Sequence, residues 1–62
     1  MGKYLKTYTV KDKRGNSYRI ETYQVFNGVL YSIYDSFDKV VDTGKFRTKK
    51  TVILHAKEFL NG

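Results

Sequence analysis

Residues 17–35 read SYRIETYQVFNGVLYSIYD. Aromatic and β-branched residues dominate on both sides of the Asn27-Gly28 dipeptide, and such residues favour β-strands. An Asn-Gly pair between two apolar segments is the strongest short-range signal for a tight β-hairpin. The stretch therefore predicts a strand over residues 17–26, a turn at Asn27-Gly28 and a second strand over residues 29–35.

The residues before this hairpin predict another one. Residues 4–10 read YLKTYTV, which alternates and is rich in strand-forming residues. Residues 12–16 are a turn signal, and Gly15 can supply the positive φ that a short hairpin loop needs. With the loop centred at residue 14, the expected cross-strand pairs are Tyr8–Ile20 and Val10–Tyr18.

The two predicted hairpins agree on which face of the sheet is apolar. A two-residue Asn27-Gly28 loop predicts three further pairs, Phe26–Val29, Gln24–Tyr31 and Thr22–Ile33. The combined register assigns eight side chains to the core face: Tyr8, Val10, Tyr18, Ile20, Phe26, Val29, Tyr31 and Ile33. The opposite face is expected to be mixed and solvated, and it holds Leu5, Thr7, Thr9, Arg19, Glu21, Tyr23, Val25, Leu30, Ser32 and Tyr34, with Lys3 and Lys11 at its edge.

The last third of the chain predicts a turn, a short strand and one helix. Residues 36–39 indicate a turn, Val40-Val41 a brief fourth strand, and Thr43-Gly44 its end. Residues 49–60 carry a helical apolar stripe, with Thr48 as N-cap and the helix ending at Asn61-Gly62; the stripe consists of Val52, Ile53, Ala56, Phe59 and Leu60. The predicted fold is α+β: a three- or four-stranded antiparallel β-meander with one C-terminal α-helix packed on one face, in a single small domain over residues 1–62.

Composition limits the kinds of site that the chain can build. The 62 residues include no cysteine and one histidine, which excludes disulfides and cysteine- or histidine-based metal sites. A domain of this size is marginally stable without disulfides or a bound metal, and dimerisation is another source of stability. A homodimer is therefore one of the expected alternatives. No segment resembles a signal peptide or a bilayer-spanning helix, and we expect a cytoplasmic protein without a membrane partner.

The charge balance favours an anionic partner. Twelve Lys and Arg residues against six Asp and Glu residues give a net charge of +6. An excess of this kind fits nucleic acid, an acidic protein surface or a membrane surface, although selection for solubility also produces it.

Residues for catalysis are poorly represented, so we expect no enzyme, no catalytic residue and no cofactor. His55 lies at the edge of the helical stripe, where a lone histidine is usually structural. Asp35, Asp38 and Asp42 have the chemistry to hold Mg²⁺ or to act as acid and base, but aspartates in such a stretch are usually turn formers. Gly44-Lys45 fails the phosphate-loop pattern, which requires Gly, four residues and then Gly-Lys-Ser/Thr.

Two groups of residues predict a binding surface. The first is the basic segment GKFRTKKT, residues 44–51, around the expected helix start. Positive side chains at a helix N-terminus oppose the helix dipole, so they are unfavourable for folding. Residues that are unfavourable for folding often indicate a functional site, although solvated basic helix starts are also common. The second is the solvated sheet face with its adjoining turn, where Arg and Tyr suit either bases or a protein partner. The predicted binding residues are Lys11, Lys13, Arg14, Arg19, Tyr23, Tyr34, Lys45, Arg47, Lys49 and Lys50.

Two segments of the sequence resemble a known family. YTVKDKRGN at residues 8–16 and GKFRTKK at residues 44–50 are similar to the arm-type DNA-binding domains of phage and transposon integrases. The resemblance implies a three-stranded sheet that docks in the DNA major groove, and an origin in a phage or mobile element. The chain departs from the pattern at the Asn27-Gly28 hairpin and in the acidic stretch 35–42, and no residue roles are carried over.

The sequence therefore supports two functional hypotheses. In the first, the protein is a small basic nucleic-acid-binding module that contacts phosphates through its basic turn and helix start. In the second, it is a small inhibitor or regulator that covers a functional surface of a host protein, through its basic groups or by adding the edge strand 4–10 to a partner's sheet. Both hypotheses use the same residues.

Overall fold

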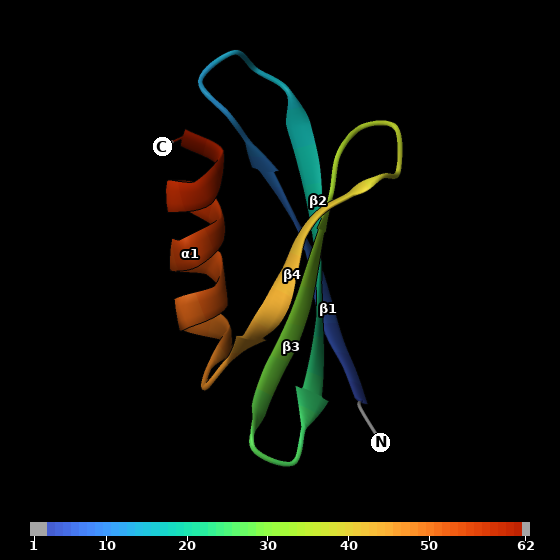
Figure 1. The fold of residues 1–62 in the computed structure, drawn as a ribbon, viewed down its shortest axis with the longest axis vertical. Helices are drawn as coiled ribbons and strands as arrows, with labels where there is room; N and C mark the ends of the chain where they lie inside the picture. Colours follow the sequence, from blue (N-terminus) through green and yellow to red (C-terminus); the bar gives the residue numbers. More distant parts are fainter. Residues whose placement is uncertain (1–2, 62) are drawn as a thin grey trace.

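The protein forms one four-stranded antiparallel sheet with a single helix on one face (Figure 1). The computed structural model describes residues 3–61. Its strands lie side by side in chain order as β1 (Lys3–Lys11), β2 (Ser17–Val25), β3 (Gly28–Tyr34) and β4 (Val40–Phe46). Helix α1 (Lys49–Asn61) follows β4 and runs along the sheet. The α+β meander predicted from the sequence is confirmed, with the fourth strand present.

The first hairpin has the predicted register. Tyr8 pairs with Ile20 and Val10 pairs with Tyr18. Gly15 has a φ of 87°, in the left-handed region that glycine adopts without a steric penalty. The alternation of residues and the glycine in the loop were therefore sufficient to place β1 against β2.

The second hairpin differs from the prediction by two residues. Val25 pairs with Gly28, so the turn consists of Phe26 and Asn27 rather than Asn27 and Gly28. The mirror-image turn that Asn-Gly favours needs positive φ at both central residues, whereas here the positive φ, 156°, falls on Gly28 alone. Gly28 also lies tightly against β4, where a Cβ atom would be 2.6 Å from the carbonyl oxygen of Phe46. The predicted core position of Phe26 is wrong, because this side chain is fully exposed at the tip of the turn.

The other predicted core-face side chains of β2 and β3 lie on the predicted face despite this shift. The predicted pairs Gln24–Tyr31 and Thr22–Ile33 are replaced by Gln24–Val29, Thr22–Tyr31 and Ile20–Ile33. A shift of two residues leaves every side chain on its own face of the sheet, because side chains alternate with a period of two. Thr22 is buried and donates a 2.8 Å hydrogen bond to the carbonyl oxygen of Lys6, so its hydroxyl is satisfied.

A β-bulge turns Leu5 to the core side of the sheet. The register of β1 against β2 shifts between Tyr4 and Lys6, and the extra residue between them packs against the core. The predicted place of Leu5 on the solvated face is therefore wrong. Tyr4 is on that face instead, half-exposed, with its ring edge-on to that of Tyr23 at 5.7 Å between centroids.

Strand β4 is longer than the sequence predicted and runs from Val40 to Phe46. Gly44 does not end it but pairs with Tyr31 within the sheet. A Cβ atom at Gly44 would lie 3.0–3.2 Å from the phenol of Tyr31, so the glycine leaves room for this ring. Lys45 consequently belongs to the strand, and the ring of Phe46 stacks on Tyr31 at 5.6 Å.

Helix α1 begins at its predicted cap. The Thr48 hydroxyl oxygen accepts a 3.3 Å hydrogen bond from the amide of Thr51, as an N-cap residue does. The helix ends at Asn61 within the described residues, and Gly62, the other predicted end residue, lies outside them.

The core lies between the helix and the middle of the sheet. Six buried side chains form it, namely Ile20, Val29, Tyr31, Ile33, Val52 and Ala56. Other apolar side chains, from all elements except β3, pack around this cluster: Leu5, Tyr8, Val10, Tyr18, Phe46, Ile53 and Leu60. No helix of the described chain is long and apolar enough to cross a bilayer.

Candidate functional site

The positive charge of the protein is mostly unneutralised in the fold. Residues 3–61 hold all twelve Lys and Arg side chains, and among them only Arg19 forms an ion pair. Lys45 donates a 2.9 Å hydrogen bond to the amide oxygen of Asn27, which leaves its charge uncompensated. The cations therefore face solvent as net positive charge.

The acidic side chains are mostly used within the structure. Asp12 and Asp35 each hold a turn, since one carboxylate oxygen accepts two backbone amide hydrogen bonds at 2.8 or 2.9 Å. A side-chain hydrogen bond from Asn16 is the largest of the effects that together lower the pKa of Asp12. The other engaged acids bind side chains: Glu21 and Asp38 bind Arg19, and Asp42 binds His55 and Tyr31.

Five cations gather at the end of the molecule where α1 begins. Lys49 and Lys50 open the helix, Arg47 precedes it, Lys45 lies near the end of β4 and Lys3 begins β1. The sheet register brings both strand residues beside the β2–β3 turn, and Figure 1 shows that turn, the start of β1 and the start of α1 at the same end. We call these five residues the basic end.

No acidic residue of the described chain belongs to the basic end. The six acids lie mid-strand (Glu21, Asp42), in the two turns at the opposite end (Asp12, Asp35, Asp38) and in the second half of the helix (Glu58). The first turn of α1 likewise contains no acid. The acids are thus absent from one end of the long axis, which measures 36 Å, whereas cations occur at both ends.

Three other predicted binding residues lie at the far end of that axis. Lys11, Lys13 and Arg14 are in and beside the β1–β2 turn, close to the C-terminal end of α1 (Figure 1). A hollow of about 400 Å³ lies there, lined among others by Asp12 and Phe59. The structure therefore does not bring the ten predicted residues onto one surface.

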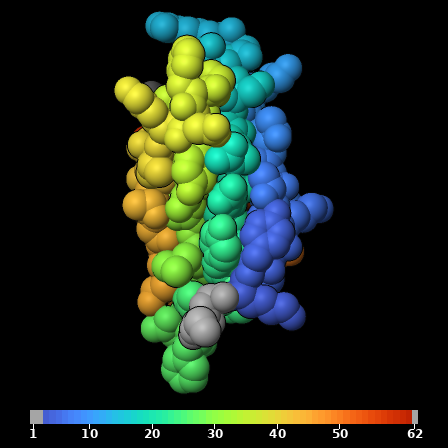
Figure 2. Space-filling view, turned by 90° about the vertical axis from the view of Figure 1, so that its right-hand side faces the viewer, coloured from blue at the N-terminus to red at the C-terminus, as the bar shows by residue number. Residues whose placement is uncertain are grey.

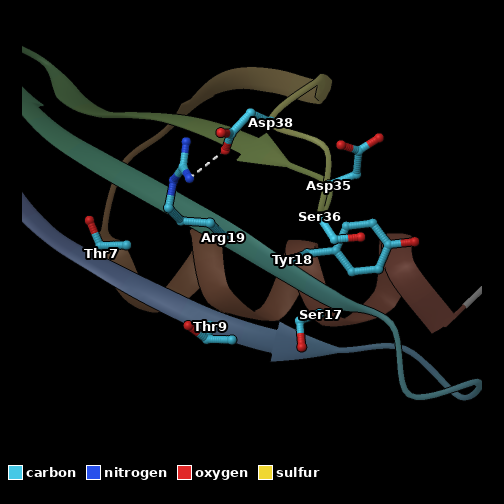
Figure 3. A pocket seen from close by; sticks show the side chains of 8 residues that line it. All are labelled: Thr7, Thr9, Ser17, Tyr18, Arg19, Asp35, Ser36 and Asp38. Atoms are coloured by element: carbon cyan, nitrogen blue, oxygen red, sulfur yellow. Dashed lines mark hydrogen bonds and ion pairs between the residues drawn. The ribbon is translucent and has the colours of Figure 1, made fainter.

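The remaining predicted residues meet on the sheet face opposite the helix. Arg19 binds Asp38 at 2.7 Å and Glu21 at 3.1 Å, and its guanidinium lies 4.5 Å from the ring centroid of Tyr34. Tyr23 donates a 3.2 Å hydrogen bond to Glu21, and this bond raises the pKa of its phenol. Figure 3 shows Arg19 reaching Asp38 beside a hollow of about 240 Å³. The charge of Arg19 is thus already balanced.

Within residues 3–61, no helix or strand covers this open face. In Figure 2 the four strands form adjacent bands, from blue β1 to orange β4, with the helix behind them. Exposed apolar side chains on it include Tyr4 and Leu30, which are 53% and 42% exposed.

His55 lies against a partner from a distant part of the sequence, Asp42. Its Nε2 lies 2.8 Å from the carboxylate of Asp42, and Tyr31 donates a second 2.8 Å hydrogen bond to the same oxygen. Burial raises the pKa of Asp42, but the hydrogen bonds from His55 and Tyr31 outweigh it and lower the value. Burial, with the bond to Asp42, raises the pKa of Tyr31 to about 12.

This cluster joins α1 to the sheet. The imidazole lies among three aromatic rings, Tyr31, Phe46 and Phe59, with centroids 5.1–5.9 Å away. None of the three polar residues, His55, Asp42 or Tyr31, lines either hollow. Their hydrogen bonds therefore hold α1 against β3 and β4. The sequence signal was available: Asp42 falls on a core-facing position once β4 is extended. No group of three or more metal-ligating side chains occurs within residues 3–61.

Comparisons of the chain with protein-family models, with curated proteins and with solved structures find no match. The resemblance to integrase arm-binding domains gains no support from them. The charge distribution and the exposed side chains are therefore the features of this protein that bear on its function.

Proposed function

We propose that the protein binds nucleic acid through the basic end, with Lys3, Lys45, Arg47, Lys49 and Lys50 in contact with phosphates. The observation that carries this proposal is the gathering of five cations at one end of the molecule without any acid of the described chain beside them. Phosphate contacts of this kind supply most of the affinity of sequence-independent binding.

The composition of the helix start supports the same proposal. Lys49 and Lys50 lie in the first turn of α1, where a positive charge opposes the helix dipole. Each such charge costs about 0.3–1 kcal/mol at an exposed site. Since neither side chain forms an ion pair in the described structure, folding stability does not explain why they stand there. Binding of an anion does.

A charge-reversal experiment tests the proposal. Lys49→Glu/Lys50→Glu changes the net charge by four units at the basic end, and Lys13→Glu/Arg14→Glu changes it equally at the far end. Affinity for fluorescently labelled oligonucleotides is measured by anisotropy for both variants and the wild type. The first variant is expected to lose at least tenfold in affinity while the second retains most of it. Equal losses in the two variants mean that only net charge matters and refute the proposed site.

One observation favours a second candidate function, binding to a host protein as an inhibitor or regulator. The open sheet face carries exposed apolar side chains, and its arginine is already neutralised. A partner bound there should survive nuclease treatment of a lysate, survive Lys49→Glu/Lys50→Glu and disappear with Leu30→Lys. Loss of every partner on nuclease treatment counts against this candidate.

The location, the origin and the oligomeric state of the protein are separate questions. A cytoplasmic location and an origin in a phage or mobile element remain predictions. A homodimer is also a prediction; β1 and β4 are the sheet edges in the described chain, and the native mass of the free protein tests pairing through them.

A further inference from the structure

One aromatic side chain projects from the basic end without any packing partner. Phe26 is 104% exposed relative to a reference chain, more than any other large apolar residue of the described structure. It occupies the first position of the two-residue turn between Val25 and Gly28. Gly, Asn, Asp, Ser and Pro are the residues that turns favour, and an exposed phenylalanine contributes nothing to the core.

The turn that carries this ring is held on both sides. The Gln24 side-chain amide donates hydrogen bonds to the carbonyl oxygens of Val25 at 3.0 Å and Gly28 at 2.9 Å, and so bridges the turn. Lys45, near the end of the neighbouring strand β4, donates a 2.9 Å hydrogen bond to the side-chain oxygen of Asn27. The close contact of Gly28 with β4 restricts the turn further. Phe26 is therefore presented to solvent by a braced turn.

The surroundings of the ring indicate what it contacts. Cations of the basic end flank the turn, with Lys45 bonded directly to its second residue. Aromatic rings beside a track of positive charge are the means by which proteins bind unpaired bases, with the backbone phosphates held by the cations. A ring at a narrow tip reaches the face of an unpaired base directly, whereas a base in a duplex must first be unstacked at a cost of a few kcal/mol.

We infer that the ligand is single-stranded nucleic acid, and that an unpaired base stacks on Phe26 while the basic end holds the adjoining phosphates. The inference rests on the proposed function and names its ligand class. Because phenylalanine has no hydrogen-bonding group, the stacked base is selected by its aromatic face and not by its identity.

The chain contains a matched control for this inference. Phe37 is 83% exposed in the β3–β4 turn, at the opposite end of the molecule. Its neighbours in that turn include Asp35, which repels phosphate, Asp38, which is paired with Arg19, and a single cation, Lys39. An exposed ring alone therefore predicts equal effects at the two positions, whereas stacking at the basic end predicts an effect at Phe26 only.

The test measures affinity for single-stranded and duplex oligonucleotides with the variants Phe26→Ala, Phe26→Leu, Phe26→Trp and Phe37→Ala. Phe26→Ala and Phe26→Leu are expected to weaken single-strand binding about 5- to 140-fold, the range that loss of one stacked base produces. Phe37→Ala should leave it unchanged, and the wild type should prefer the single strand. The wild type has no tryptophan, so indole fluorescence in Phe26→Trp reports on this position alone and should be quenched by the bound strand.

Three results overturn the inference. Unchanged single-strand affinity in Phe26→Ala, with binding still lost in Lys49→Glu/Lys50→Glu, removes the stacking role and leaves the proposed function intact. Absence of oligonucleotide binding by the wild type removes both. Binding of the wild type to anionic lipid vesicles that depends on Phe26, without any effect of Phe26 on oligonucleotides, assigns the ring to a membrane surface instead.

Discussion

The phenol of Tyr31 should make the fold sensitive to alkali. Its pKa is about 12 in the folded protein, above the ordinary value of 10.0, because the ring is buried and its hydroxyl donates to Asp42. The unfolded chain therefore loses this proton before the folded chain does. The stability that the neutral phenol contributes is complete below pH 10 and is lost as the pH rises through 12.

The size of this loss follows from the shift. Two pKa units at about 1.36 kcal/mol each give about 2.7 kcal/mol, a large part of the stability of a domain of this size. Tyr31→Phe removes the ionisable group and the hydrogen bond to Asp42. This variant should be about 1–3 kcal/mol less stable than the wild type at pH 8, because hydrogen bonds to charged groups are strong.

Urea denaturation followed by far-ultraviolet circular dichroism at pH 8, 10, 11 and 12 measures the effect. The wild type should lose about 2.3 kcal/mol more than Tyr31→Phe between pH 8 and pH 12, where the folded phenol is half ionised, so that the two stability curves converge. Titration of the other tyrosines and of the lysines contributes to both curves. Parallel curves would contradict this prediction, because they mean that the folded protein holds the Tyr31 proton no more tightly than the unfolded chain does.

Further predictions concern the N-cap of α1, the β2–β3 turn and the loss of stability at low pH. Thr48→Ala should cost about 1 kcal/mol by urea denaturation, while Thr48→Ser keeps the capping oxygen and should cost less. Gly28→Ala should cost at least about 1–3 kcal/mol, since the new Cβ meets the Phe46 carbonyl oxygen at 2.6 Å in a strained backbone conformation; Gly15→Ala has positive φ but open space and should cost less. The lowered pKa of Asp42 means that its contribution is present above about pH 4 and is lost as the pH falls through the folded value. Asp42→Asn should therefore flatten the acid side of the stability profile.

Local sequence patterns predicted most of this fold because they act over short distances. Alternation and Gly15 set the first hairpin, and the apolar stripe with Thr48 set the helix. The second turn was misplaced because Gly28 is required for its close approach to β4, a contact that the Asn-Gly rule does not include. The bulge at Leu5 has no sequence signal, since it depends on which side chains the finished core accommodates.

The candidate site was less predictable than the fold. The sequence shows where cations are numerous, and four of the five residues of the basic end were predicted; Lys3 was not, because it joins them only through the pairing of β1 with β2. The neutralisation of Arg19 by Asp38 likewise depends on contacts between distant segments. Phe26 was assigned to the core for the same reason, since its exposure follows from the register of one turn.

The salt dependence of oligonucleotide affinity is the most direct test of phosphate binding at the basic end. Each phosphate held by a cation contributes about −0.7 to the slope of log affinity against log salt for a single strand, so full use of the five cations of the basic end gives about −3.5. Phosphate binding at this end predicts a slope approaching this value for the wild type. It also predicts a slope shallower by about 1.4 for Lys49→Glu/Lys50→Glu, and little change for Lys13→Glu/Arg14→Glu. A flat salt dependence, or a slope that the first pair of substitutions leaves unchanged, would contradict it.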